Sequence, residues 1–175
     1  MLNVNELCGF GAGGDKSHLY WRLYIRHSND GGGDIIRNVS ELSLKGVSGG
    51  ANLATGGTPF IGSDYPGAVV TDVMGVLADV FNGVLTAGHT FQNLVGGSSS
   101  PGTPNHIGYQ FAAPVNIVEF DVSIATQFML TPNCAPTDFE LQWSDDGVTY
   151  TRAGSAVLES SWTSASPQTK TYSAL

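Results

Sequence analysis

Short segments of this chain show the apolar patterns of β-strands. Residues 19–26 (LYWRLYIR) are dense in aromatic and branched side chains, and residues 40–45 (SELSLK) alternate polar and apolar side chains with a period of two. Both patterns are typical of strands. The last part of the chain predicts further strands at residues 107–111, 115–126, 139–144, 148–152 and 169–175.

Turn-forming residues separate these segments. Asp145, Asp146 and Gly147 join two predicted strands as a hairpin, and residues 46–67 carry scattered Gly, Pro, Thr and Asn and are interpreted as irregular. Between residues 69 and 81, apolar side chains recur at helical spacing, which predicts one short helix, although Gly75 weakens the pattern. Strands joined by long loops, with almost no helix, predict a sandwich.

The composition agrees with an all-β domain. At 175 residues the chain is long enough for one domain with a core and short for two. Its 41% hydrophobic and 13% charged residues indicate a folded globular protein, and its 23 glycines favour short strands with tight turns. We expect a β-sandwich over residues 18–175, preceded by a Gly-rich arm over residues 1–17 that docks on another subunit.

Charge and hydropathy exclude several partners. Lys and Arg total 7 against 15 Asp and Glu, a net charge of −8, which repels phosphate backbones and argues against a nucleic-acid partner. No apolar run approaches the ~20 residues that span a bilayer, so no membrane insertion is predicted. Residues 1–14 lack the pattern of a secretory signal, so we expect synthesis in the cytoplasm. Cys8 and Cys134 are predicted to be free thiols, and a disulfide between them is the alternative.

Two segments fit the residue patterns of catalytic motifs but lack the secondary structure that those motifs need. Residues 9–14 fit G-x-G-x-x-G, but a dinucleotide loop precedes a helix and here a strand follows. Residues 46–50 fit G-x-S-x-G, but a nucleophile elbow needs a strand-to-helix turn, and residues 51–59 are a predicted loop. Asp145 and Asp146 are neighbours in a turn, so their side chains diverge. The sequence therefore predicts a protein that is not an enzyme.

Four segments together resemble the discoidin, or coagulation-factor type C, family. Residues 138–151 (DFELQWSDDGVTYT) resemble a hairpin of the family, and residues 81–83 (FNG) resemble its FDG loop. Residues 107–115 (IGYQFAAPV) are similar to its central strand and turn, and residues 20–25 with residues 39–46 are similar to its last strand pair. The resemblance implies a galactose-binding-like jelly-roll β-sandwich.

The order of these segments differs from the family pattern. The strand pair that closes an ordinary member opens this chain, which indicates a circular permutation and resembles proteins of tailed-bacteriophage particles. This implies a virion protein of the tail or head surface, made in the host cytoplasm and oligomeric in the particle. It is predicted to bind glycans or the host cell surface and to aid attachment. The alternative is a structural decoration or tail subunit that binds only neighbouring virion proteins.

The resemblance also implies a structural Ca²⁺ site near the FDG loop. Carried over to this chain, the ligands are Asn82, Glu41 and a threonine, Thr86 or Thr90, with Asp79 nearby. Oxygen donors of this kind suit Ca²⁺. Asn82 stands where the family has an aspartate, which removes one negative charge. The alternative is a loop that hydrogen-bonds to itself around Asn82.

Sugar binding in such folds uses aromatic faces on loops at one edge of the sandwich. The candidates in this chain are Trp162, Tyr65, Phe60 and Phe91. Trp162 is the strongest, because it stands in the polar run of residues 159–164, and the alternative for its ring is a lid on the core. Trp21 and Trp143 lie within predicted strands and are interpreted as core or sheet-face residues.

Overall fold

The computed structural model describes residues 16–29, 36–85, 89–95, 98–99, 103–125, 134–163 and 167–175, with the backbone alone for residues 72–74, 89–95 and 98–99. The elements are β1 (His18–Ser28), β2 (Ile36–Val39), β3 (Glu41–Lys45), β4 (Thr58–Gly62), β5 (Ala68–Gly75), the 3₁₀ helix η2 (Leu77–Phe81), β6 (His89–Val95), β7 (Ser98–Ser99), β8 (Asn105–Val115), β9 (Glu119–Ile124), β10 (Pro136–Ser144), β11 (Thr151–Leu158) and β12 (Gln168–Ser173).

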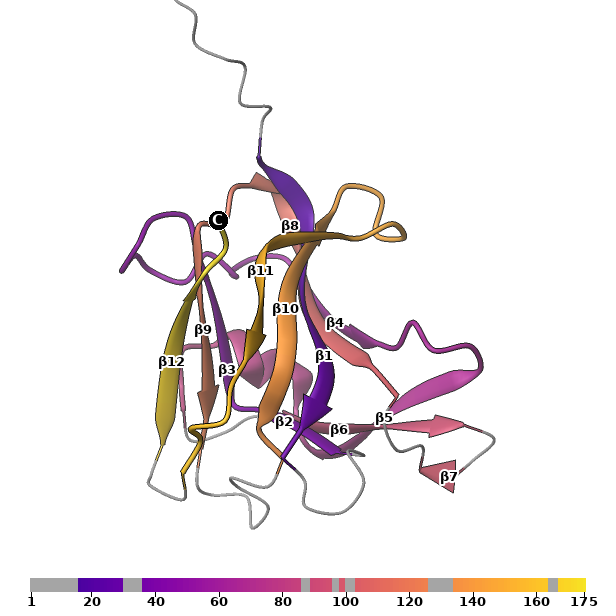
Figure 1. Ribbon diagram of the computed structural model, residues 1–175. Helices are drawn as coiled ribbons and strands as arrows, with labels where there is room; N and C mark the ends of the chain where they lie inside the picture. Colours follow the sequence, from indigo (N-terminus) through magenta and orange to yellow (C-terminus); the bar gives the residue numbers. More distant parts are fainter. Residues whose placement is uncertain are drawn as a thin grey trace, which may run out of the picture.

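Two antiparallel sheets form a sandwich (Figure 1). One sheet has five strands in the order β11-β10-β1-β8-β4, and the other has three in the order β12-β9-β3. A further sheet, β2-β6-β5 with β7 paired to β6, extends sideways from the sandwich (Figure 1). The predicted all-β sandwich is confirmed, and the jelly-roll topology stays a prediction.

The core lies between the two sheets and follows from the period-two pattern of the strands. In β1 the side chains of Trp21, Leu23 and Ile25 are buried. The three-stranded sheet faces them with apolar residues of β3 and β9, and β8 and β10 add others at alternate positions. These residues are Leu42, Leu44, Phe120, Val122, Ile124, Ile107, Tyr109, Phe139 and Leu141. Burying a large apolar side chain contributes roughly 1.5–3 kcal/mol, so this layer supplies the main drive for folding.

The first residues of β1 lie at the same end of the sandwich as the carboxyl end of the chain (Figure 1). Lys16 and Leu175 line one cavity there. A circular permutation requires this proximity, because an ordinary member continues without a break from the strand that is last here into the strand that is first here. The permutation itself stays a prediction. Cys134 is buried, and Cys8 and most of the predicted arm lie outside the described residues.

The helix predicted between residues 69 and 81 is wrong for most of its length. Ala68–Gly75 forms the strand β5, and only Leu77–Phe81 is helical, as one 3₁₀ turn. The valines of this segment are β-branched, which favours a strand, and Gly75 has a positive φ of 87° that ends the extended segment. No helix in the described part of the chain is long and apolar enough to cross a bilayer.

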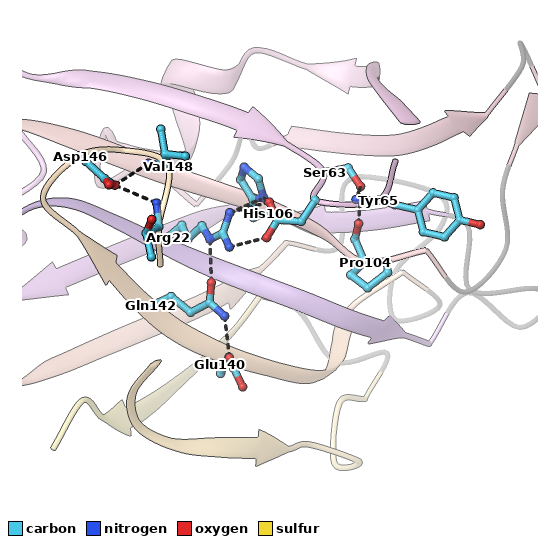
Figure 2. Close-up of polar contacts among 11 residues, drawn as sticks. Arg22, Ser63, Tyr65, Pro104, His106, Glu140, Gln142, Asp146 and Val148 are labelled. Atoms are coloured by element: carbon cyan, nitrogen blue, oxygen red, sulfur yellow. Dashed lines mark hydrogen bonds and ion pairs between the residues drawn. The ribbon is translucent and has the colours of Figure 1, made fainter. Parts of the chain in front are cut away.

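Several strand boundaries also differ from the prediction. The strand expected over residues 148–152 begins only at Thr151, because the Asp146 carboxylate accepts the N–H groups of Val148 and Thr149 at 2.8 Å each and holds them in a turn (Figure 2). The strand expected over residues 115–126 is two strands, β8 and β9, with a break at residues 116–118. Strand β4 lies within the segment interpreted as irregular.

Candidate functional site

The alternation that buries Trp21 directs Arg22 to the outer face of the five-stranded sheet. There Arg22 is paired with Gln142 of β10 and with Gly108 of β8. Gly108 is paired in turn with Phe60 of β4. One row across four strands therefore carries an amide, a guanidinium and an aromatic ring beside one another.

The row depends on the absence of a side chain at position 108. A Cβ atom there would lie 2.5 Å from Cζ of Phe60, 2.6 Å from the carbonyl oxygen of Trp21 and 2.8 Å from Cβ of Arg22. The Phe60 ring thus packs directly on the strand backbone next to Arg22. A glycine in the middle of a strand is a known mark of such a close approach.

Alanine at position 108 is expected to lower the free energy of unfolding by about 1–3 kcal/mol, because the added methyl group meets a backbone oxygen that cannot move aside. Urea unfolding measures this change. A second substitution, Phe60→Ala, is expected to restore only part of the loss, because the Trp21 carbonyl stays in place. Wild-type stability in Gly108→Ala would contradict the close packing.

The Arg22 guanidinium is held by three partners from three elements (Figure 2). Nη1 and Nη2 donate to the two carboxylate oxygens of Asp64 at 2.9 and 2.5 Å. Nε donates to Oε1 of Gln142 at 2.7 Å, and Nη1 lies 3.1 Å from Nδ1 of His106. The Arg22 side chain is 5% exposed, whereas that of Asp64, in the loop after β4, is 48% exposed. The pair thus presents its carboxylate to solvent.

This geometry fixes the protonation of His106. A guanidinium only donates hydrogen bonds, so Nδ1 of His106 accepts and the imidazole is neutral. Burial and the charge of Arg22 lower the pKa of His106 to about 4, and Asp64, 3.6 Å away, does not offset them. Burial opposes ionisation of Asp64, but the hydrogen bonds and charge of Arg22 outweigh it and lower the pKa of that carboxyl.

A second line of polar contacts continues from Gln142. Its Nε2 donates to Oε1 of Glu140 at 2.6 Å, and Oε2 of Glu140 accepts from Arg26 at 2.7 Å. Arg26 also donates to Asp138 at 2.6 Å. The two arginines of β1 are therefore linked through the polar side chains of β10, and each group fixes the orientation of the next.

Four aromatic rings surround the Arg22–Asp64 pair. The Tyr150 ring lies over Arg22, with its centroid 3.6 Å from Cζ, and the Tyr24 ring lies 5.3 Å away. Phe60 contacts Tyr20 with a centroid separation of 6.4 Å. All four rings are partly exposed. We call the rings of Tyr20, Tyr24, Phe60 and Tyr150, with the Arg22–Asp64 pair between them, the outer-face platform.

Of the predicted sugar-binding residues, the platform contains Phe60 alone. Tyr65 is 46% exposed and follows Asp64 in the same loop, but its ring points away from Arg22 (Figure 2). Phe91 lies on β6, and its side chain is outside the described residues. Phe60 and Tyr65 therefore do not belong to one cluster.

The structure places Trp162 as a lid on the core, the alternative noted for it. Its side chain is 7% exposed, and Nε1 donates to the carbonyl of Pro136 at 2.7 Å. The ammonium group of Lys170 lies 4.6 Å from its ring centroid. Trp162 also lines a cavity of about 310 Å³ with Leu158. Its burial fits a lid on the core better than a sugar platform, and sugar binding by Trp162 stays a prediction.

Three of the predicted calcium ligands, Glu41, Asn82 and Asp79, lie near one another, and the side chains of Thr86 and Thr90 are outside the described residues. Glu41 is buried, and its carboxylate accepts the N–H of Gly83 at 3.1 Å and Nδ2 of Asn52 at 3.2 Å. Asn82 donates to Asp79 at 3.1 Å. The groups directed at Glu41 are thus N–H donors, which fit a loop held by hydrogen bonds better than a shell of oxygen ligands. Calcium binding stays a prediction.

Several side chains of the site are not predicted by the sequence pattern: Arg22, Asp64, His106, Gln142 and Tyr150. These residues are far apart along the chain, so no local spacing joins them. The usable signals were the arginine and tyrosines at outward positions of β1 and the glycine inside β8. Both signals indicate that side chains pack on the outer face of the large sheet.

Comparison with protein-family models, with curated proteins and with solved structures finds no match to this chain.

Proposed function

We propose that this protein is a non-enzymatic surface component of a phage particle that binds glycans through the outer-face platform. The observation that supports this is the set of four partly exposed rings around the Arg22–Asp64 pair. Aromatic faces pack against the apolar side of a pyranose, and a half-exposed carboxylate such as that of Asp64 accepts hydrogen bonds from sugar hydroxyls.

The platform is built on strands and is fixed before any ligand arrives. Tyr20, Tyr24 and Phe60 belong to β1 and β4, and Tyr150 is held against Arg22. Side chains that are already ordered lose little conformational entropy on binding, which favours recognition of a flexible polysaccharide.

The assignment to a phage virion rests on the permuted order of the discoidin-like segments. It implies neighbouring virion proteins as further partners and an oligomeric arrangement in the particle. Such an arrangement would multiply a weak single-site affinity for host glycans, because linked sites bind one surface together.

Alanine at Phe60 or Tyr150 is expected to weaken glycan binding roughly tenfold, because each change removes one stacking surface. Purified protein would first be applied to a glycan array and to host cells, and the variants then titrated against the best glycan. Tyr65→Ala is the matched control, since it removes an exposed ring that points away from the platform.

Two outcomes would contradict the proposal. Loss of binding in Tyr65→Ala, with Phe60→Ala and Tyr150→Ala unaffected, would move the site to the loop edge. If the folded wild-type protein bound no glycan and no cells, the structural decoration or tail subunit would replace it. Circular dichroism and melting temperature check that each variant is folded.

A further inference from the structure

A cavity of about 340 Å³ opens at the end of the sandwich where β1 begins and the chain ends. Trp21 and Ala153 reach it from the core, so it lies between the sheets and is separate from the outer-face platform. Its walls are mostly apolar: Trp21, Trp143, Ile117, Ala153, Ala174 and Leu175. Protein interiors are close-packed, so an opening of this size has room for a ligand.

The aromatic wall of the cavity is fixed by its own contacts. The rings of His18 and Trp143 are stacked, with centroids 3.5 Å apart and planes inclined by 8°. Nδ1 of His18 lies 3.1 Å from the carboxylate of Asp145. Trp21 donates Nε1 to the carbonyls of His18 and Val115 at 3.2 Å each. These contacts hold the three rings in place without a ligand.

The polar side chains of the lining are cationic or neutral. Lys16 is exposed where it lines the cavity, and Asn116 and Arg152 also line it. Nη1 of Arg152 lies 3.9 Å from Glu140 on the outer face, so Lys16 is the cation assigned to a ligand. Among the described residues that line the cavity, none is an aspartate or a glutamate.

We propose that this cavity binds a small organic carboxylate with an apolar body. The body would pack against Trp21, Trp143 and the alanines, and the carboxylate would face the Lys16 ammonium group. An ion pair at the solvent-exposed edge of the cavity gives a carboxylate a moderate preference over a neutral analogue. Burial of the apolar body against the walls supplies most of the affinity. The proposal is independent of glycan binding, because it uses another part of the molecule.

The test uses 4-phenylbutyrate and its neutral analogue 4-phenyl-1-butanol, followed by calorimetry and by tryptophan fluorescence from Trp21 and Trp143. We expect the carboxylate to bind about fivefold more tightly than the alcohol at low salt. Lys16→Met should remove this preference. Lys45→Met, which makes the same change in net charge at an ion pair on the three-stranded sheet, should keep it.

A second part of the experiment fills the cavity with larger side chains. Ala153→Leu and Ala174→Leu, made separately in case one packs poorly, are expected to abolish binding of both compounds and to leave glycan binding unchanged. Binding that persists in both folded variants would overturn the site. Equal affinity for acid and alcohol in the wild type would overturn the preference for a carboxylate, and no binding of either compound would overturn the whole proposal.

Discussion

Asparagine in place of Asp64 is expected to lower the free energy of unfolding by about 3 kcal/mol, because it leaves the Arg22 guanidinium buried without a counter-charge. The Arg22 side chain is 5% exposed, and its planar guanidinium only donates hydrogen bonds, so it needs acceptors in this buried position. This loss of unfolding free energy is at the low end of the range for breaking a buried ion pair, because Asp64 itself is half-exposed. Urea unfolding at pH 7 measures it.

The opposite substitution tests the same argument from the other partner. Arg22→Met leaves Asp64 free to meet water, and its main cost is the unsatisfied Oε1 of Gln142, about 1–2 kcal/mol. We therefore expect Arg22→Met to be the milder change. Asp145→Asn is the matched control, since its carboxylate is 63% exposed beside His18 and should contribute less than about 1 kcal/mol. A larger loss in Arg22→Met than in Asp64→Asn would contradict the burial argument.

The strands that pack against both neighbours in the large sheet were predictable from local pattern. β1 and β10 carry dense apolar side chains at alternate positions, and these side chains are buried. The polar side chains of Arg22 and Gln142 between them are buried as well, which the alternation does not predict. β5 was not predictable in this way, because its valines fit a helical spacing as well as a strand. The segment is a strand because it pairs with β6, and the local pattern of residues 68–75 does not show this pairing. Residues 58–62 likewise form a strand because β8 offers an edge to pair with.

The candidate site could be predicted only in part. Phe60 was chosen because it is an aromatic residue in a presumed loop, and it is in the platform because β4 pairs with β8 opposite Gly108. Arg22 could have been noticed as a charge between buried neighbours, but its partner Asp64 comes from a loop whose position depends on the whole sheet. Trp162 shows the converse: a polar surrounding sequence does not prevent a ring from packing onto the core.

The stability conferred by His106 is expected to fall as the pH is lowered from 6.5 to 4. Burial and Arg22 hold the pKa of His106 at about 4 in the folded chain, against 6.5 for an ordinary histidine. Above pH 6.5 the imidazole is neutral in both states, so its contribution is fully present. Between these values only the unfolded chain binds the proton, which favours unfolding by up to roughly 3 kcal/mol at pH 4.

Other groups titrate in the same range, so the measurement is a difference between two proteins. Burial raises the pKa of Glu41 to about 7, which favours folding as the pH falls toward 4.5 and opposes the effect of His106. His106→Gln keeps an acceptor for Arg22 and leaves Glu41 unchanged, so subtracting the two stability curves isolates the histidine. The wild type should lose stability relative to His106→Gln between pH 6.5 and 4, and the His106 ring signal should titrate near pH 4 by NMR. Parallel curves, with titration near pH 6.5, would show that the imidazole is not held neutral by Arg22.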